Sequence, residues 1–233
     1  MAIFSSTPVQ ARLTLRVLAH LLRYPDAELR SHIPEMQQAL RSEAALPAAR
    51  LVELQALLQH LTTQSTMDVE AEYVELFDRG RRTALHLFEH VHGDSRDRGP
   101  AMIDLIQTYE KAGLFLGASE LPDYLPVVLE FASTQPPPQA RDFLGEIAHI
   151  VRVIFSALLK RTSPYASVLA AVLELAGEKA EAVAIAPEPE MDESWAEPEV
   201  FGGCSTEGQA KPSASQTIHF VKKPVTTSLG EQA

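Results

Sequence analysis

The sequence of 233 residues lacks the features that mark secreted and membrane-spanning proteins. It has a single cysteine, Cys204, which excludes an intrachain disulfide and favours a reducing compartment. No stretch approaches the roughly 20 consecutive apolar residues that a membrane-spanning helix needs. The N-terminal sequence has no basic start followed by an apolar centre and a small-residue cleavage site, so we expect no signal peptide. These absences predict a cytoplasmic protein that does not insert into a membrane.

Features of several catalytic and nucleic-acid-binding classes are also missing. The phosphate-binding patterns G-x-x-x-x-G-K-[ST] and G-x-G-x-x-G do not occur. The net charge of −11 at pH 7 argues against a nucleic-acid partner, because phosphate binding needs a basic face. Cys204 stands among residues in which nothing would lower a thiol pKa or hold a base beside it. We therefore expect no catalytic site and no cofactor, and a basic peptide or protein surface as the partner.

What the sequence does contain is helical periodicity. Aromatic residues make up only 6 % of the chain, whereas leucine and alanine recur throughout, which favours helices over strands. Apolar residues repeat at spacings of three and four until about residue 180, and no alternating strand pattern interrupts them. We predict an all-α, single-domain helical bundle over residues 1–186. Its helices are expected to begin near Pro8, at residue 28, after Pro47, at Val69, at Thr83, after Pro100, at Pro122, after Pro138 and at Pro164.

The character of the chain changes after residue 186. Residues 187–233 hold five prolines, eight acidic residues and three lysines, so this segment carries a charge of −5. Such a composition buries too little apolar surface to offset the entropy of the chain. We predict a largely disordered acidic tail.

Residues 73–99 carry the densest polar pattern. A helix with Val69, Tyr73 and Phe77 on one face is interrupted at Gly80, and a second short helix is expected over residues 83–91. A polar loop follows, His-Gly-Asp-Ser-Arg-Asp-Arg-Gly over residues 92–99, bracketed by two glycines that permit a tight turn. A charged loop of this kind between apolar helices is where a functional surface is expected.

One short motif within this stretch suggests a metal site as an alternative. His86, Glu89 and His90 match the pattern H-x-x-E-H of inverted zinc proteases. On a helix the two histidines would share one face and could bind Zn²⁺, with Glu89 as general base and Glu174 as a distant third ligand. Five residues with three fixed positions are weak support, and a helix with two half-exposed histidines is the favoured explanation.

Three segments together resemble a known family. They are Tyr-Val-Glu-Leu-Phe-Asp at residues 73–78, the loop 92–99 continuing to Met102, and Glu-Leu-Pro-Asp-Tyr-Leu-Pro-Val-Val-Leu-Glu-Phe at residues 120–131. In order and spacing they resemble the NarJ-type nitrate reductase assembly chaperones, which belong with the TorD and DmsD types to the redox-enzyme maturation chaperones. The resemblance extends over about residues 10–178.

The resemblance implies a cytoplasmic, all-helical and non-enzymatic chaperone. Such proteins bind the N-terminal segment of the apo catalytic α subunit of a membrane-bound nitrate reductase, keep it competent for molybdenum cofactor insertion and delay its docking to the membrane. In the wider family an E-x-P-D-H segment forms a hinge. Here Glu120, Pro122 and Asp123 match it, whereas Tyr124 replaces the histidine, so a titrating imidazole at that position is lacking. A client among other molybdoenzymes, such as dimethyl sulfoxide or trimethylamine oxide reductase, is the alternative.

We expect helix-in-groove recognition by residues 73–131, with an apolar target helix flanked by pairs to acidic side chains. For the apolar members of this set, plain core packing is the alternative, and for Asp94, Arg96 and Asp123 it is a local network that shapes the loop. The oligomeric state, a monomer or a weak homodimer, stays open. The candidate partner-binding residues are Tyr73, Phe77, His92, Asp94, Arg96, Arg98, Glu120, Pro122, Asp123, Tyr124, Leu125 and Val128.

Overall fold

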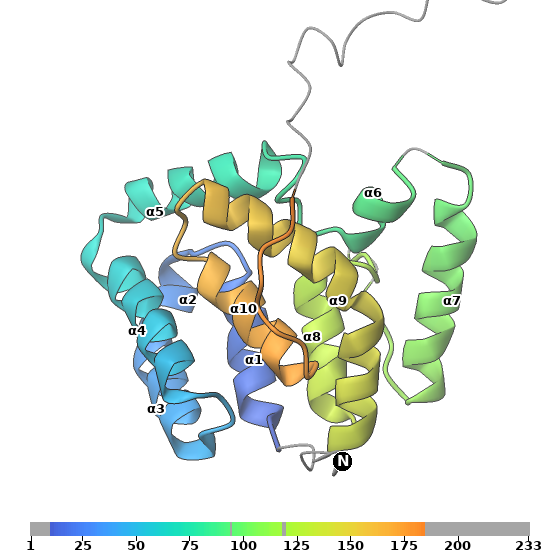
Figure 1. Cartoon of the computed structure of the whole chain (residues 1–233), viewed down its shortest axis with the longest axis horizontal. Coiled ribbons are helices and arrows are strands. Elements are labelled where there is room, and N and C mark those ends of the chain that lie inside the picture. Colours follow the sequence, from blue (N-terminus) through green and yellow to red (C-terminus); the bar gives the residue numbers. More distant parts are fainter. Residues whose placement is uncertain (1–9, 94, 118–119, 185–233) are drawn as a thin grey trace, which may run out of the picture. The chain divides into compact units, whose positions relative to one another are not determined.

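The computed structural model describes residues 10–93, 95–117 and 120–184 (Figure 1). These residues form helices and no β-strand, which confirms the all-α prediction. Asp94 and the tail predicted for residues 187–233 lie outside the described residues, so the boundary between domain and tail stays a prediction. The elements are α1 (Arg12–Leu21), α2 (Ala27–Ser31), α3 (Ile33–Glu43), α4 (Ala48–Thr63), α5 (Thr66–Tyr73), the π-helical turn η1 (Val74–Asp78), α6 (Leu87–Val91), α7 (Arg98–Lys111), α8 (Leu125–Thr134), α9 (Pro137–Lys160) and α10 (Ala166–Leu175).

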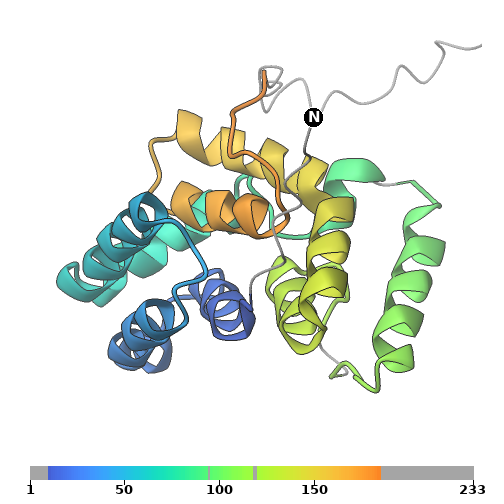
Figure 2. The same ribbon diagram turned by 60° about the horizontal axis from the view of Figure 1, so that its bottom comes forward.

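Helix α1 is central to the packing of the bundle. It contacts α3 on one side and α8 on the other, and it also contacts α10 (Figure 2). Leu15, Leu18 and Leu21 face inward and are at most 2 % exposed. Burying a leucine side chain stabilises a fold by about 1.5–3 kcal/mol relative to leaving it in water. The apolar spacing of this segment therefore fixes both its helical form and its place in the core.

Helices α8, α9 and α10 complete the core. Helix α9 packs against both α8 and α10, and α10 also contacts α4. The prediction that Pro122 opens a helix is wrong, because α8 begins three residues later at Leu125 and Pro126 occupies its first turn. Helix α9 begins inside the proline run, at Pro137. Proline is tolerated in a first turn because the backbone N–H that it lacks has no partner within the helix there.

The helix expected from residue 28 is divided into α2 and α3 at His32. Asp26 caps α2, since its side chain accepts a hydrogen bond of 2.8 Å from the Leu29 amide. The Arg30 side chain donates to the carbonyl oxygens of Leu61 at 2.8 Å and Gln64 at 2.7 Å. These carbonyls belong to the last turn and the C-cap of α4, where no intrahelical partner is available, so Arg30 ties α2 to α4.

Helix α5 continues into η1, and the predicted apolar face of this segment is buried. The interruption at Gly80 is confirmed, and its cause is steric. A Cβ atom at this position would collide with the Thr83 hydroxyl and the Leu76 carbonyl oxygen. That hydroxyl donates to the same carbonyl, so only glycine allows the chain to turn away from η1 here.

Helices α6 and α7, which we call the arm, differ from the prediction in two ways. The helix predicted over residues 83–91 is shorter, because α6 begins only at Leu87 and His86 before it is extended. The helix predicted after Pro100 is present, but of α7 only Tyr109 is buried, and Ile103 is 56 % exposed. In Figure 1 α7 stands at the edge of the bundle, and among the described elements it makes no extensive contact with another helix.

Candidate functional site

The segments on either side of the arm are joined by a short backbone pairing. The amide of Leu87 donates to the Asp123 carbonyl at 3.0 Å, and the amide of Leu125 donates to the Leu85 carbonyl at 2.9 Å. His86 and Tyr124 face each other across this antiparallel bridge. We call residues 85–88 and 122–125 the junction. The junction contains Pro122, Asp123 and Tyr124 of the E-x-P-D segment, and it lies where the arm joins the bundle.

Asp123 lies at the centre of the junction. Its side chain is 0 % exposed, and its Oδ2 accepts a hydrogen bond of 3.1 Å from the Phe88 amide at the start of α6. Arg98, at the start of α7, places a guanidinium nitrogen 3.8 Å from the same oxygen. A buried carboxylate needs such partners, because burial without them costs several kcal/mol. Asp123 therefore couples the beginning of α8 to both helices of the arm.

After Arg98, His86 is the second ionisable group that lies beside Asp123. The sequence had suggested His86 as a zinc ligand instead. Its Nδ1 lies 3.5 Å from the Asp123 Oδ1, and its ring stacks on Tyr124 with 5.2 Å between ring centroids. The Asp123 carboxylate beside the ring raises the pKa of His86, although burial acts in the opposite direction. At 3.5 Å neither atom has a well-formed hydrogen bond, so we describe the contact as an ion pair when the ring is protonated. No spacing rule relates residue 86 to residue 123, which is why the sequence did not reveal this ion pair.

Tyr124 connects the junction to the bundle. Its hydroxyl lies 3.4 Å from the Tyr73 hydroxyl and 3.4 Å from the Leu22 carbonyl oxygen, which also accepts a hydrogen bond of 2.8 Å from Tyr73. Burial raises the pKa of both phenols, so they stay neutral at physiological pH. Tyr124 stands where the E-x-P-D-H segment has histidine. Its phenol can donate a hydrogen bond, but unlike an imidazole it does not titrate near pH 7.

Two neighbouring motif residues anchor further elements. The Pro122 carbonyl accepts a hydrogen bond of 2.8 Å from the Tyr109 hydroxyl of α7. Glu120 lies 3.7 Å from Arg23, which also reaches Glu130 of α8 at 3.6 Å. These two pairs are half-exposed, and such surface pairs contribute little to stability. Arg23 was not among the predicted site residues, and nothing in its sequence context indicates these partners.

The four apolar residues predicted to line a groove lie in the core. Tyr73, Phe77, Leu125 and Val128 are at most 6 % exposed. Tyr73 and Phe77 pack on each other with 4.8 Å between their ring centroids, and Leu125 and Val128 belong to the same apolar cluster. A bound helix could touch them only if the elements around them separated, so the alternative of core packing describes the conformation seen here.

The charged loop before α7 is placed at the surface. Arg96 is exposed, and His92 is partly buried with its ring against Phe88, 5.6 Å between centroids. Arg98 reaches Glu89 at 3.5 Å in addition to Asp123, so it forms a local network with these two carboxylates at the start of α7. Asp94 lies outside the described residues. Partner binding by this loop stays a prediction.

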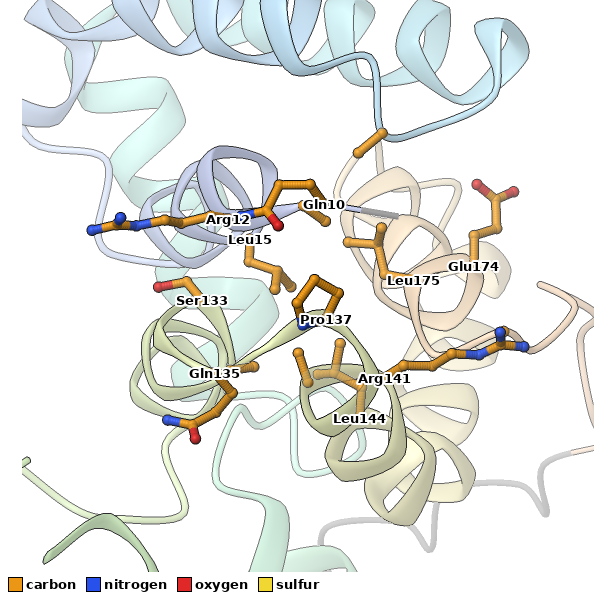
Figure 3. Close-up of a pocket in the computed structure, with 15 residues that line it drawn as sticks. Gln10, Arg12, Leu15, Ser133, Gln135, Pro137, Arg141, Leu144, Glu174 and Leu175 are labelled. Atoms are coloured by element: carbon orange, nitrogen blue, oxygen red, sulfur yellow. The ribbon is translucent and has the colours of Figure 1, made fainter. Parts of the chain in front are cut away.

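The geometry required by the zinc alternative is not present. His86 precedes α6 and is extended, so it does not share a helical face with His90, whose Nε2 lies 2.8 Å from the Ala84 carbonyl oxygen. Glu174 pairs with Arg50 at 3.0 Å beside a separate cavity of about 110 Å³. Figure 3 shows the charged ends of Arg12, Arg141 and Glu174 pointing away from the middle of that cavity. Within the described residues no three His, Cys, Asp or Glu side chains gather as a metal site would require.

A helix that crosses a bilayer must be both long and apolar. None of the described helices is long and apolar enough to do so. Helix α9 spans 24 residues, but charged residues recur along its exposed side.

Comparison with known proteins gives consistent results. Residues 23–171 match the nitrate reductase delta subunit family. The chain is 46 % identical over 162 residues to the nitrate reductase molybdenum cofactor assembly chaperone NarJ of Escherichia coli (strain K12), covering 70 % of this chain and 69 % of that protein. It is 32 % identical over 152 residues to the nitrate reductase-like protein NarX of Mycobacterium tuberculosis (strain H37Rv), covering 65 % of this chain and 22 % of that longer protein.

Among solved structures, the fold resembles a redox enzyme maturation protein from Archaeoglobus fulgidus. The TM-score is 0.51 at 20 % sequence identity, and the match covers 76 % of this chain and 100 % of the other. At this identity the likeness concerns the fold, and it confirms the predicted bundle type.

Proposed function

The chain belongs to the nitrate reductase delta subunit family, as the resemblance in its motifs predicted, and we propose that it is an assembly chaperone for a nitrate reductase. It binds the apo catalytic α subunit through that subunit's N-terminal segment. It keeps the subunit competent for molybdenum cofactor insertion and delays its docking to the membrane. The chaperone itself makes and breaks no covalent bond.

One observation carries this proposal. A protein described as a nitrate reductase molybdenum cofactor assembly chaperone is 46 % identical over 162 residues, a span that covers 70 % of the chain. Relatives at this level share their fold and the arrangement of their surface, and fold alone would not support a function. The motif at residues 120–131 adds support, since its polar residues organise the junction.

Two features of the described residues support a binding protein rather than a catalyst. The ionisable groups of the junction are engaged with one another and with backbone amides, so they do not converge on an open cavity. The charges of the arm, in contrast, stand at the surface, where they would orient a partner and speed association more than they would add affinity.

The test is assembly of the enzyme in cells that lack this protein. We expect nitrate reductase that is deficient in molybdenum and inactive, with restoration of both when the full chain is supplied. Cells making the chaperone but no cofactor should yield a complex of the chaperone with the apo catalytic subunit, identified by mass spectrometry. Recovery of a dimethyl sulfoxide or trimethylamine oxide reductase subunit instead would assign the protein to a sibling client. Normal molybdenum content in the deletion strain would refute the proposal.

A further inference from the structure

A group of basic side chains lies where α9 ends beside η1. Two segments far apart in the sequence supply it, residues 79–82 after η1 and residues 160–161 at the end of α9. We call its members the basic patch: Arg79, Arg81, Lys160 and Arg161, which are exposed, and Arg82, which is partly buried. The whole chain carries a net charge of −11, so a local excess of positive charge needs an explanation.

Contacts at η1 bring the two segments together. The carbonyl oxygen of Glu75 lies 3.5 Å from a guanidinium nitrogen of Arg161. The carbonyl of the next residue, Leu76, accepts a hydrogen bond from the hydroxyl of Thr83, which is 0 % exposed. The end of α9 and the turn of residues 80–83 therefore meet at neighbouring carbonyl groups. This brings the two arginines that precede Thr83 into the same region of the surface as Arg161.

Carboxylates offset only part of the charge of this region. Within residues 74–82 and 158–163 the acidic side chains are Glu75 and Asp78. Five basic residues against these two leave a local charge of +3. Arg79 lies 3.2 Å from Glu75, but the two side chains are 74 % and 63 % exposed, and pairs at such exposure contribute little to stability. Arg79 can therefore exchange Glu75 for the carboxylate of another molecule at little cost.

Helix capping explains part of the basic patch. Lys160 is in the last turn of α9, and Arg161 and Arg79 are the C-cap residues of α9 and η1. Positive side chains at these positions offset the partial negative charge of a helix end. That explanation does not extend to Arg81 and Arg82, which lie in the turn beyond η1. The positive charge therefore exceeds what the helix ends require.

The composition of the basic patch favours carboxylates as its ligands. All but one of its cations are arginines, whose planar guanidinium groups bind a carboxylate through two parallel hydrogen bonds. Phosphates are bound in the same way. A nucleic acid or an anionic membrane, however, presents negative charge far beyond the basic patch, and a chain of net charge −11 would repel it. A short acidic segment of a protein contacts the basic patch alone.

We propose that the basic patch is a binding site for an acidic segment of a partner protein, a short run rich in glutamate and aspartate. The guanidinium groups of Arg81 and Arg161 and the ammonium group of Lys160 pair with carboxylates along that segment. The inference goes beyond the proposed function, because recognition of the catalytic subunit by the chaperone does not depend on it.

The test uses the full-length chain and a fluorescently labelled oligoglutamate peptide, with oligoglutamine of the same length as the neutral control. Fluorescence anisotropy at low salt should show saturable binding of oligoglutamate and none of oligoglutamine. The affinity should fall at least about fivefold when the ionic strength rises from about 0.01 to about 0.1 M, because the Debye length shortens from about 30 Å to about 10 Å. Absence of binding at low salt, or binding that salt does not weaken, would contradict the proposal.

Charge reversal locates the site. Arg81→Glu and Lys160→Glu should each weaken binding about fivefold, since each replaces an attraction by a repulsion. Lys111→Glu is the matched control, because Lys111 is exposed at the end of α7 and its reversal changes the net charge by the same amount. This control should change the affinity less than about twofold, and circular dichroism should first verify that all variants fold. A photo-reactive phenylalanine at position 81 should cross-link to the peptide, whereas the same group at position 111 should not.

Each contrary outcome overturns a defined part of the inference. Equal weakening by Lys111→Glu would show that the net charge of the chain, and not the basic patch, governs binding. Retention of the chain on phosphatidylglycerol vesicles without binding of oligoglutamate would assign the basic patch to a membrane surface. Displacement of the peptide by an equal concentration of inorganic phosphate would assign it to phosphate groups. None of these outcomes alters the expected assembly of nitrate reductase, so the proposed function is tested separately.

Discussion

The central bundle and the arm are built on different principles. In the bundle, helices α8 and α10 bury almost all of their residues, and α1 is enclosed by α3, α8 and α10. In the arm, α7 runs for 14 residues with one of them buried. Its attachment includes a small apolar cluster, in which Tyr109 packs on Phe131 with 4.6 Å between ring centroids and Leu105 packs beside them, and polar contacts at Pro122 and Asp123.

The difference shows how stability and adaptability are divided within one chain. Apolar burial holds the bundle in a single arrangement, because any displacement would expose surface that costs about 25 cal/mol per Å². Helix α7 is held by one small apolar cluster and a few directional contacts, each of the latter contributing about 0.5–1.5 kcal/mol, so it is expected to open at a lower free energy than the bundle. The family motif falls where the two regions meet.

The largest contrast should come from truncating an apolar side chain in each region. Leu129→Ala in α8, at a site that is 0 % exposed, should lower the free energy of unfolding by about 2–5 kcal/mol through lost burial and a residual cavity. Ile103→Ala in α7, at a site that is 56 % exposed, should change it by no more than about 0.5 kcal/mol. Urea denaturation followed by circular dichroism measures both. Equal losses would show that the arm is as tightly packed as the bundle.

Asp123→Asn should have the next largest effect. The amide keeps an oxygen for the Phe88 N–H but loses the charge that attracts His86 and Arg98, and we expect a loss of about 1–3 kcal/mol. Hydrogen exchange should accelerate in α6 and α7 more than in α10. Uniform acceleration across all helices would mean that Asp123 stabilises the whole fold rather than the attachment of the arm.

Tyr109→Phe should loosen the arm by a smaller amount. It removes the hydrogen bond of 2.8 Å to the Pro122 carbonyl while keeping the aromatic packing on Phe131, at a cost of about 1 kcal/mol. The control is Tyr24→Phe, because Tyr24 is 43 % exposed and outside the arm. Hydrogen exchange in α7 should quicken with the first variant and remain at the wild-type rate with the second.

The smallest effect should be the pH dependence of the pair formed by His86 and Asp123. Because the folded-state pKa of His86 is raised, its stabilising contribution is complete below the unfolded value near 6.5 and disappears as the pH rises through the folded pKa. The stability difference between wild type and His86→Gln should therefore be larger at about pH 5.5 than at about pH 9. NMR titration of the imidazole should place its midpoint above about 6.5, the ordinary histidine value. A midpoint below that value would contradict the ion pair.

Local patterns in the sequence predicted most of the helices, but not the residue at which a helix begins when an irregular segment precedes it. The spacing of Val17, Leu18 and Leu21 identified α1, because helical periodicity is a local property. The start of α6 was misplaced by four residues, since residues 83–86 have helical composition but His86 is drawn into the pairing with Tyr124. Tertiary pairing overrides local propensity at such positions, and a single sequence carries no sign of it.

The candidate site was predicted in part. The motif around Asp123 forms a connected unit in the structure, and its role in partner binding stays a prediction, whereas Tyr73 and Phe77 are core residues. Their periodicity could not distinguish an apolar groove from an apolar core, because both require the same spacing on a helix.

By itself, the sequence determined that the protein is all-helical, where most of its helices lie and to which family it belongs. Periodicity, capping residues and motifs involve residues that are close together in the chain, so a single sequence shows them. Only the tertiary structure decided that Asp123 binds the arm to the bundle and that His86 pairs with it. These arrangements join residues that are distant in the chain. Their geometry follows from the burial of many side chains together, which no local pattern specifies.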